Sequence, residues 1–261
     1  MDYAVIPFEN SSNGSVVQTF DLLADRDHFY EDVRVCGEHY LTVHHCLLVR
    51  KGAFDSEHSK HNSITKLYTH PQAWGQCEKF LSKHLKSVER QDVSSTSKAA
   101  EIISTENPGT SAAIASRFAA EYHGIDVLEP NIEDKSNNTT RFLILRNSKS
   151  KPTIRSSIER DTKTAMARKK TLISFTVNHE SPGALVDALL VFKTHGLNLT
   201  SINTRPSRRR PWHYVFFVEC RWVPTKDDRE VMESLLKSLH EIVENCRELG
   251  TWNDRLLQAQ S

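Results

Sequence analysis

The residues best suited to chemistry in this sequence lie in three short polar segments. The first is Glu9-Asn10-Ser11-Ser12-Asn13-Gly14-Ser15, which precedes an apolar-periodic stretch at 15–23 that predicts a helix. Backbone N–H groups at a helix start, with small residues before them, bind anions, and Glu9 could accept a proton or a hydroxyl hydrogen bond. The same residues are typical of an N-cap cluster that only closes a turn. Local sequence leaves both interpretations open.

The second segment, residues 137–142, places an arginine at the start of an expected strand. The guanidinium of Arg141 suits a carboxylate ligand held through a bidentate pair of hydrogen bonds, and the hydroxyl of Thr140 lies beside it in sequence. An Asn-rich turn before a strand would explain the same residues. The third segment, Thr69-His70-Pro71-Gln72, predicts a helix start. Proline is favourable in the first turn of a helix, because the N–H that it lacks would have no hydrogen-bond partner there anyway.

Composition and missing motifs narrow the class of protein. The sequence has no HExxH, no P-loop, no GxSxG and no GxGxxG, and its histidines lack metal-ligand spacing, so we expect no metal. Five cysteines without a CxxC pair argue for a reducing compartment. A net charge of +1 indicates neither nucleic acid nor membrane as a partner, and no apolar run is long enough to cross a bilayer. With no secretory signal visible, we expect a cytoplasmic protein.

Strands and helices alternate around these segments. We expect strands at 3–7, 39–50, 87–89, 125–128 and 141–145, and helices at 15–23, 71–85, 94–103 and 110–124. This alternation predicts an α/β layer structure with a sheet rich in parallel strands.

The pattern stops at 147–170 and then restarts. That stretch carries eight Lys/Arg against two Asp/Glu and almost no apolar residues, which predicts a basic linker. Residues 171–256 follow the order strand, helix, strand, strand, helix, strand, which predicts an antiparallel sheet with both helices on one face. Nucleic-acid binding by Arg205, Arg208, Arg209 and Arg210 is a weaker interpretation than a solvated hairpin loop.

Four segments, in this order, resemble the prephenate dehydratase family: IPFENSSNGSVVQTFDLL, YTHPQAWGQC, TSAAIASRFAAEYHGIDVLEPNIED and NNTTRFLIL. The C-terminal βαββαβ pattern resembles an ACT domain. Its residues Gly183, Ala184, Leu185 and Val186 match the family's GALV segment. Asn203, Thr204, Arg205 and Pro206 stand where the family usually has Glu-Ser-Arg-Pro.

The resemblance implies an enzyme that converts prephenate to phenylpyruvate with loss of water and carbon dioxide, in phenylalanine biosynthesis, without a cofactor. It implies a catalytic domain at 1–146 built of two α/β lobes like a periplasmic binding protein, with substrate between the lobes. After the basic linker at 147–170, an ACT (ferredoxin-like) domain at 171–256 would bind L-phenylalanine as feedback effector in a homodimer or homotetramer. The implied catalytic residue is Thr140. The implied substrate-binding residues are Glu9, Asn10, Ser11, Thr69, Gln72, Arg141 and Phe142. The implied effector residues are Gly183 to Val186 and Asn203 to Pro206.

The chemistry of the residues agrees with this. A threonine hydroxyl is too weak an acid to act as a full general acid, but Thr140 can donate a hydrogen bond to the departing hydroxyl and hold it in line. Arg141 and the Asn10-Ser11 segment could anchor the side-chain carboxylate of prephenate. The carboxylate that leaves as CO2 should lie in a less polar place, because a salt bridge would stabilise its charge.

The sequence also departs from the family pattern. Thr69 replaces the usual serine, and Asn203 replaces the usual glutamate of the effector segment. Family members have further elements before the Pro-x-Glu-Asn-Ser segment, so we expect an N-terminally incomplete first lobe and poor catalysis by this chain alone. Two alternatives stay open: an arogenate dehydratase, whose substrate has an amino group in place of a keto oxygen, and a catalytically inactive phenylalanine sensor.

Overall fold

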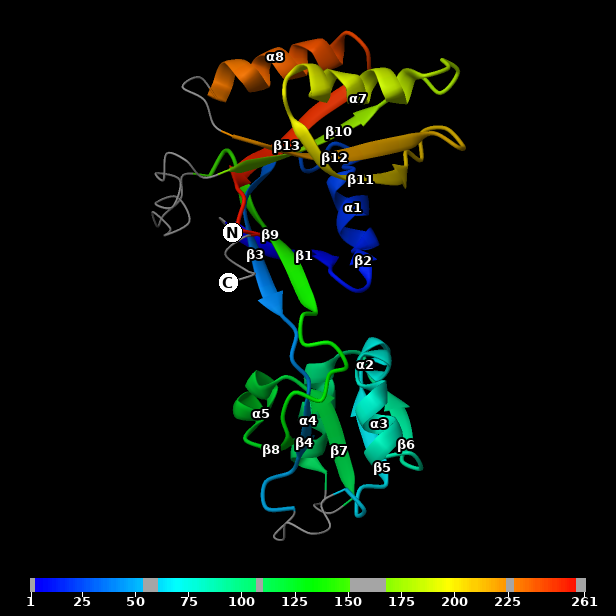
Figure 1. Ribbon diagram of the computed structural model, residues 1–261, viewed down its shortest axis with the longest axis vertical. Helices are drawn as coiled ribbons and strands as arrows, with labels where there is room; N and C mark the ends of the chain where they lie inside the picture. The colour runs from blue at the N-terminus through cyan, green and yellow to red at the C-terminus, as the bar shows by residue number, and fades with distance from the viewer. Residues whose placement is uncertain (1–2, 54–60, 107–109, 151–167, 224–227, 257–261) are drawn as a thin grey trace. The chain divides into compact units, whose positions relative to one another are not determined.

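The computed structural model describes residues 3–53, 61–106, 110–150, 168–223 and 228–256 (Figure 1). The chain forms two compact units, one at 42–139 and one that combines 1–41 with 140–261. Each unit is described by itself.

The unit at 42–139 is a five-stranded sheet between two pairs of helices. Its strand order is β6-β5-β7-β4-β8, with bounds Glu89–Asp92, Lys66–Thr69, Ser111–Ala115, Cys46–Val49 and Asp126–Glu129. Only β5 pairs in parallel, with β6 and β7, whereas β4 pairs antiparallel with β7 and β8. The sheet is therefore mixed, and the expected parallel-rich sheet is half correct.

Helices α2 (Pro71–Gln76) and α3 (Glu78–His84) share one apolar cluster with the sheet, and α4 (Thr96–Thr105) and α5 (Arg117–His123) share another. The expected helix at 71–85 is interrupted at Cys77, whose backbone leaves the helical region. The expected helix at 110–124 is wrong in its first half, because residues 111–115 form the strand β7. Helix formers adopt a strand here because tertiary context overrides propensity: residues 112–115 are fully buried between the two helical layers.

The other unit contains a sheet of order β2-β1-β9-β3, with bounds Gly14–Ser15, Tyr3–Asn10, Thr139–Asn147 and Val33–Thr42. The sequence predicted that the first strand stops at Pro7, but β1 continues past this residue. A β-bulge between Pro7 and Glu9 accommodates the proline, and the strand continues to Asn10. The strand expected at 39–50 is two strands in different sheets, because β3 ends at Thr42 and β4 begins at Cys46.

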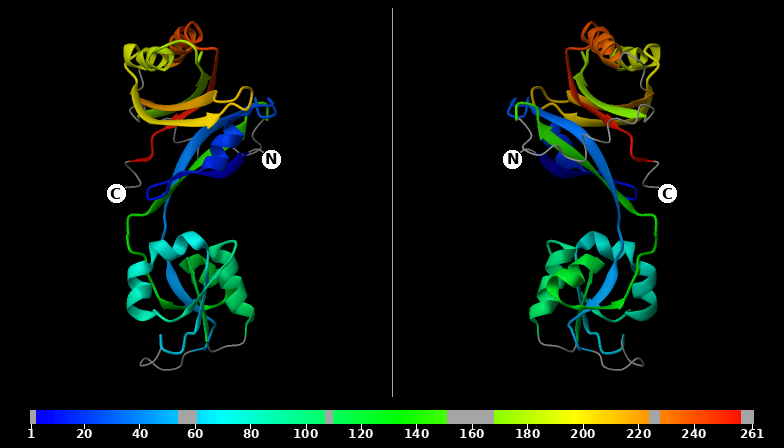
Figure 2. Two further views of the ribbon diagram at one scale, coloured as in Figure 1. Left: turned by 90° about the vertical axis from the view of Figure 1, so that its right-hand side faces the viewer. Right: turned by 90° about the vertical axis from the view of Figure 1, so that its left-hand side faces the viewer.

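The C-terminal elements have the order expected for 171–256. They are β10 (Lys169–Thr176), α7 (Ala184–Thr194), β11 (Asn198–Pro206), β12 (Tyr214–Trp222), α8 (Asp228–His240) and β13 (Asn245–Asn253). The sheet has the order β11-β12-β10-β13 with antiparallel pairs, and α7 and α8 cover one face (Figures 1 and 2). Because β10 begins at Lys169, the last two residues of the expected linker belong to the strand. Residues 151–167 of that linker lie outside the described part of the chain.

The other face of this C-terminal sheet packs on the sheet formed by β1, β9 and β3. One apolar cluster joins Phe8, Phe20, Leu23, Val35 and Leu143 to Leu172, Phe217, Leu249 and Trp252. The backbones approach so closely at Gly250 that a Cβ there would lie 2.1 Å from the carbonyl oxygen of Val35. The N-terminal sheet and the C-terminal elements therefore share a core.

Candidate active site

The polar segment at 9–15 forms the tip of a β-hairpin, with β1 paired to β2. The side-chain oxygen of Asn10 accepts hydrogen bonds from the backbone N–H groups of Ser12 and Asn13, at 3.0 and 2.9 Å. Helix α1 (Val17–Leu23) begins only at Val17, and its N-cap residue Val16 makes no side-chain cap. The helix start assumed by both sequence interpretations is therefore wrong for this segment, although Asn10 does close a turn, as the second interpretation expected.

Asn10 and Thr140 lie opposite each other on β1 and β9. The Nδ2 atom of Asn10 donates to Oγ1 of Thr140 at 3.1 Å. The amide can face only this way, because its oxygen already binds two backbone N–H groups. Thr140 thus accepts a hydrogen bond from Asn10, and its own hydroxyl hydrogen has no acceptor among the described residues. The Asn10–Thr140 pair therefore offers the Thr140 hydroxyl as a hydrogen-bond donor to a ligand.

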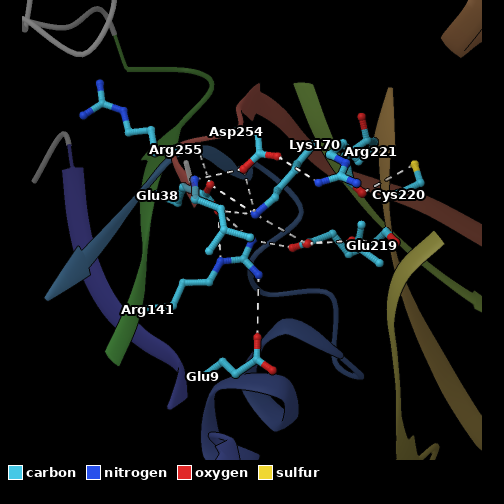
Figure 3. Close-up of polar contacts among 12 residues, drawn as sticks. Glu9, Glu38, Arg141, Lys170, Glu219, Cys220, Arg221, Asp254 and Arg255 are labelled. Carbon is cyan, nitrogen blue, oxygen red and sulfur yellow. Dashed lines mark hydrogen bonds and ion pairs between the residues drawn. The ribbon is translucent and has the colours of Figure 1, made fainter. Parts of the chain in front are cut away.

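Arg141 lies in a buried cluster of charges (Figure 3). Its Nε donates to Glu38 at 2.9 Å, and its NH2 nitrogen contacts both Glu38, at 2.7 Å, and Glu219. Its NH1 nitrogen is 3.7 Å from the half-exposed carboxylate of Glu9. Two of the three guanidinium nitrogens are already bound, so the expected bidentate grip on a ligand carboxylate is not available in this arrangement.

Lys170 is a second buried cation in this cluster. Its Nζ lies 2.9 Å from the hydroxyl of Tyr40 and 3.2 Å from carboxylate oxygens of both Glu38 and Asp254. Burial and the charge of Arg141 act to lower the pKa of Lys170, but the nearby carboxylates outweigh them, and the pKa is raised. For Arg141, burial is likewise outweighed by Glu219 and Glu38, which raise its pKa.

Sequence reasoning did not find Glu38, Lys170 or Glu219. A signal was present, because Glu219 interrupts the apolar strand Tyr214–Trp222 and Glu38 lies inside Val33–Thr42. A charged residue within a buried strand is rare unless it is paired. What the sequence does not show is which charges pair, since the paired residues of this cluster lie from 49 positions (Lys170 and Glu219) to 132 positions (Lys170 and Glu38) apart along the chain.

Thr69 and Gln72 belong to the unit at 42–139. Thr69 ends β5 and is buried, and its hydroxyl donates to the carbonyl oxygen of Ile114 at 2.7 Å. Helix α2 starts with Pro71 as expected, and the ring of His70 caps it by accepting from the N–H of Gln72, at 3.3 Å. Gln72 is exposed. Both residues lie at the carboxyl end of a parallel strand, where ligands of α/β sheets commonly bind.

The two expected effector segments lie on different C-terminal elements. Gly183, with φ of 84°, caps α7, and Ala184 begins its first turn. Asn203, Arg205 and Pro206 lie on β11. All three contact the N-terminal segment. The Asn203 side-chain oxygen accepts a hydrogen bond from the hydroxyl of Ser15 at 2.6 Å. Arg205 pairs with Asp21 at 2.9 Å, and the Pro206 carbonyl oxygen accepts from Arg26.

A cavity of about 720 Å³ lies in the same unit, but neither effector segment lines it. Its walls include Phe175, His179, Arg210 and Tyr214. Among the described residues, no group of three His, Cys, Asp or Glu side chains is placed to hold a metal ion. The described helices include none that is long and apolar enough to cross a bilayer.

Fold and site define an α/β protein with a paired Asn-Thr donor beside a buried charge cluster and a C-terminal βαββαβ unit. Residues 1–150 match the prephenate dehydratase family. The chain therefore belongs to that family.

Individual relatives agree. The chain is 39% identical over 220 residues to a bifunctional chorismate mutase/prephenate dehydratase of Stutzerimonas stutzeri, covering 84% of this chain and 53% of that protein. It is 34% identical to a prephenate dehydratase of Methanocaldococcus jannaschii, covering 90% of this chain and 75% of that one. A solved prephenate dehydratase from Arthrobacter aurescens, in complex with L-Phe, superposes with a TM-score of 0.77 at 26% identity, covering 97% of this chain and 75% of that one.

Proposed function

We propose that the protein converts prephenate to phenylpyruvate with loss of water and carbon dioxide. Family membership supports this reaction, and the observation that carries it is the Asn10–Thr140 pair. Because Asn10 donates to the Thr140 oxygen, the Thr140 hydroxyl is oriented to donate in turn. The chain spans 53% of the Stutzerimonas relative, so only the dehydratase reaction is proposed for it.

In the proposed reaction, the electrons of the ring–carboxylate bond move into the ring as CO2 leaves. The C–O bond on the opposite side of the ring breaks, and the departing hydroxyl leaves with its electron pair and takes a proton from solvent to become water. Charge therefore develops on the departing oxygen in the transition state. A hydrogen bond from Thr140 to that oxygen strengthens as the charge grows, which is the kind of contact that raises kcat.

The substrate carboxylates are proposed to bind outside the Arg141 cluster. One nitrogen of Arg141, NH1, makes no contact with Glu38 or Glu219 among the described residues and lies 3.7 Å from the half-exposed carboxylate of Glu9. A carboxylate there would meet Glu9 as well as Arg141, so Arg141 offers at most one hydrogen bond. Phe142, the next residue of β9, is half-buried and is proposed to contact the substrate ring. Ser11, Thr69 and Gln72 remain proposed contacts for the polar groups of the substrate.

Residues 171–256 are proposed to be an ACT domain that binds phenylalanine as feedback effector, with 1–146 as the catalytic domain and the basic linker between them. The βαββαβ order and the L-Phe complex of the Arthrobacter protein support this. The effector segments lie at the first turn of α7 and on β11. Binding there would lower turnover by favouring one arrangement of the protein over another.

A homodimer through β11 is proposed as the form that completes the effector site. Strand β11 is the edge of its sheet, and it exposes Leu199 and Ile202. On the neighbouring helix α7, Val186 and Leu190 are also exposed. An exposed sheet edge with apolar side chains favours pairing with a second strand, and a second copy supplies one.

Free cysteines support the proposed cytoplasmic location. All five cysteines are free thiols, as expected in a reducing compartment.

Turnover of prephenate and of arogenate by the purified protein tests the function. The former yields phenylpyruvate and the latter phenylalanine, and both are measured by chromatography. We expect Thr140→Ala to lower kcat by about a hundredfold or more, because an oxyanion-type donor is lost, whereas Thr140→Ser retains part of the activity. Preference for arogenate would replace the proposed substrate. Phenylalanine binding by a folded protein without any turnover would show a sensor, and unchanged kcat in Thr140→Ala would remove Thr140 from the mechanism.

A further inference from the structure

Side chains of β11 make two links toward the Asn10–Thr140 pair, one to Ser15 of β2 and one, through Glu219 of β12, to Arg141. One contact reaches the hairpin of Asn10, and the other reaches Arg141, the residue after Thr140. The β11 residues that make these contacts, Asn203 and Thr200, are not proposed catalytic residues. We propose that β11 positions Thr140 through these two links, so that an effector bound on β11 acts on the catalytic hydroxyl directly. This rests on the proposed dehydratase function.

The first link joins Asn203 to the hairpin. The Ser15 hydroxyl donates to the side-chain oxygen of Asn203 at 2.6 Å, across 188 residues of chain. Ser15 lies opposite Glu9, and Gly14 lies opposite Asn10, in the pairing of β2 with β1. A shift of Asn203 therefore moves the short strand that holds the Asn10 turn in place.

The second link runs through Glu219. The Thr200 hydroxyl donates to Oε1 of Glu219 at 2.9 Å, and Oε2 of Glu219 accepts from Arg141 (Figure 3 shows the Glu219–Arg141 contact). Thr200 is the extra residue of a β-bulge, since Leu199 pairs with Cys220 and Ser201 with Glu219. Bulges re-aim a side chain, and this one places a hydroxyl on the carboxylate that holds Arg141.

Burial makes the second link stiff. Glu219 is 2% exposed and Arg141 6% exposed, and Glu38 binds the other side of the guanidinium. A guanidinium held by two carboxylates on different strands has little freedom to rotate. Because Arg141 and Thr140 are adjacent in β9, the position of the Thr140 backbone follows that of Arg141.

The geometry thus makes Ser15, Thr200 and Glu219 positioning residues and predicts a coupled response. If effector binding displaces β11, both links change together, and the Thr140 hydroxyl leaves the line of the departing oxygen. A misplacement of about 1 Å in such a site can cost on the order of a hundredfold in rate. Reciprocity requires that variants which loosen the links also change the effect of bound phenylalanine.

The experiment removes each link by a substitution at a residue that is not one of the proposed catalytic residues. Ser15→Ala removes the first and Thr200→Val the second. Both substitutions act on exposed or half-buried side chains, so folding should survive. Ser12→Ala, in the same hairpin but without a hydrogen bond to β11 among the described residues, and Thr200→Ser, which keeps the hydroxyl, are the matched controls. Steady-state turnover is measured with and without saturating phenylalanine.

We expect Ser15→Ala and Thr200→Val each to lower kcat about two- to tenfold, as for a lost hydrogen bond, with KM nearly unchanged. In the double variant, the ratio of activities without and with phenylalanine should approach one. The controls should match the wild type. Single and double variants that behave like the controls in kcat and in this ratio would overturn the proposal.

Hydrogen–deuterium exchange keeps the test separate from the proposed reaction. Even in a protein without turnover, Ser15→Ala and Thr200→Val should raise amide exchange in residues 139–147 relative to their controls, because the strand is held less tightly. Unchanged exchange there would refute the positioning role. Absent wild-type turnover alongside raised exchange would refute the reaction but not the links.

Discussion

Lys170→Met is the most stringent test of the buried charge cluster. The Lys170 ammonium lies 3.2 Å from Glu38 and from Asp254, and 3.9 Å from Glu219. The three carboxylate side chains are each no more than 3% exposed. Methionine keeps the length of the side chain but removes its charge, which leaves Glu38 and Glu219 with Arg141, and Asp254 with Arg221 at 3.8 Å. Removing one partner of a buried ion pair costs about 3–5 kcal/mol.

The pH dependence of the same variant follows from the raised pKa of Lys170. Its burial and the charge of Arg141 oppose the rise, and the carboxylates of Glu219 and Glu38 produce it. Between the unfolded pKa and the higher folded pKa, the folded state binds more protons than the unfolded state, so stability falls as pH rises. The contribution is complete below pH about 10.4 and is lost above it. Burial also raises the pKa of Tyr40, which acts in the same direction.

Urea unfolding followed by circular dichroism at pH 7 and in alkaline buffer measures both effects. The control is Lys169→Met, which removes a neighbouring cation of intermediate exposure and should cost at most about 1 kcal/mol. We expect Lys170→Met to lose less stability than the wild type on going to alkaline pH. A free energy of unfolding at pH 7 within about 1 kcal/mol of the wild type, at equal m-value, would refute the reasoning.

Three further outcomes follow from single positions. Gly250→Ala should lower the free energy of unfolding by about 1–3 kcal/mol or more, because its Cβ would lie 2.1 Å from the Val35 carbonyl oxygen; full stability would contradict the close approach. The pKa of Asp21 is lowered from 3.8 to about 2, chiefly by its hydrogen bond from Arg205, so stability present above pH 3.8 is lost as pH falls toward 2. In Asp21→Asn, acid titration of unfolding should show a smaller loss over that interval, and an unchanged loss would count against the pair. Burial raises the pKa of the Cys220 thiol to about 12, so iodoacetamide at pH 8 should label it only after unfolding; mass spectrometry that finds it labelled in native protein would contradict its burial.

The sequence predicted the elements whose signals are local. Ser95 caps α4 by accepting from the N–H of Lys98, and Gly124, with φ of 65°, ends α5 as a left-handed cap. The alternating apolar residues of β10 and β12 were enough to place the C-terminal strands. For the two helix ends, the energy that selects the conformation comes from residues a few positions apart.

Predictions failed where distant residues decide the conformation. The alanine-rich segment 112–115 favours a helix by propensity, yet it forms a central strand that is fully buried between two helical layers. The polar segment at 9–15 resembles a helix cap, yet pairing of β1 with β9 extends the strand to Asn10. Neither partner is visible in a local window, so tertiary pairing overrides the local preference.

The hydrogen bonds of the Asn10–Thr140 pair decide which ligand atom fits it. The amide oxygen of Asn10 is bound to two backbone N–H groups, and one of its N–H groups is directed to Thr140. Thr140 can therefore offer a hydrogen to an acceptor, which suits a departing hydroxyl oxygen better than a group that must itself donate. The neighbouring Arg141 is held by Glu38 and Glu219 and faces Glu9, so it neither competes for that oxygen nor attracts the carboxylate that must leave. A buried cation whose charge is already balanced can hold a strand in position without stabilising the anion that decarboxylation has to remove.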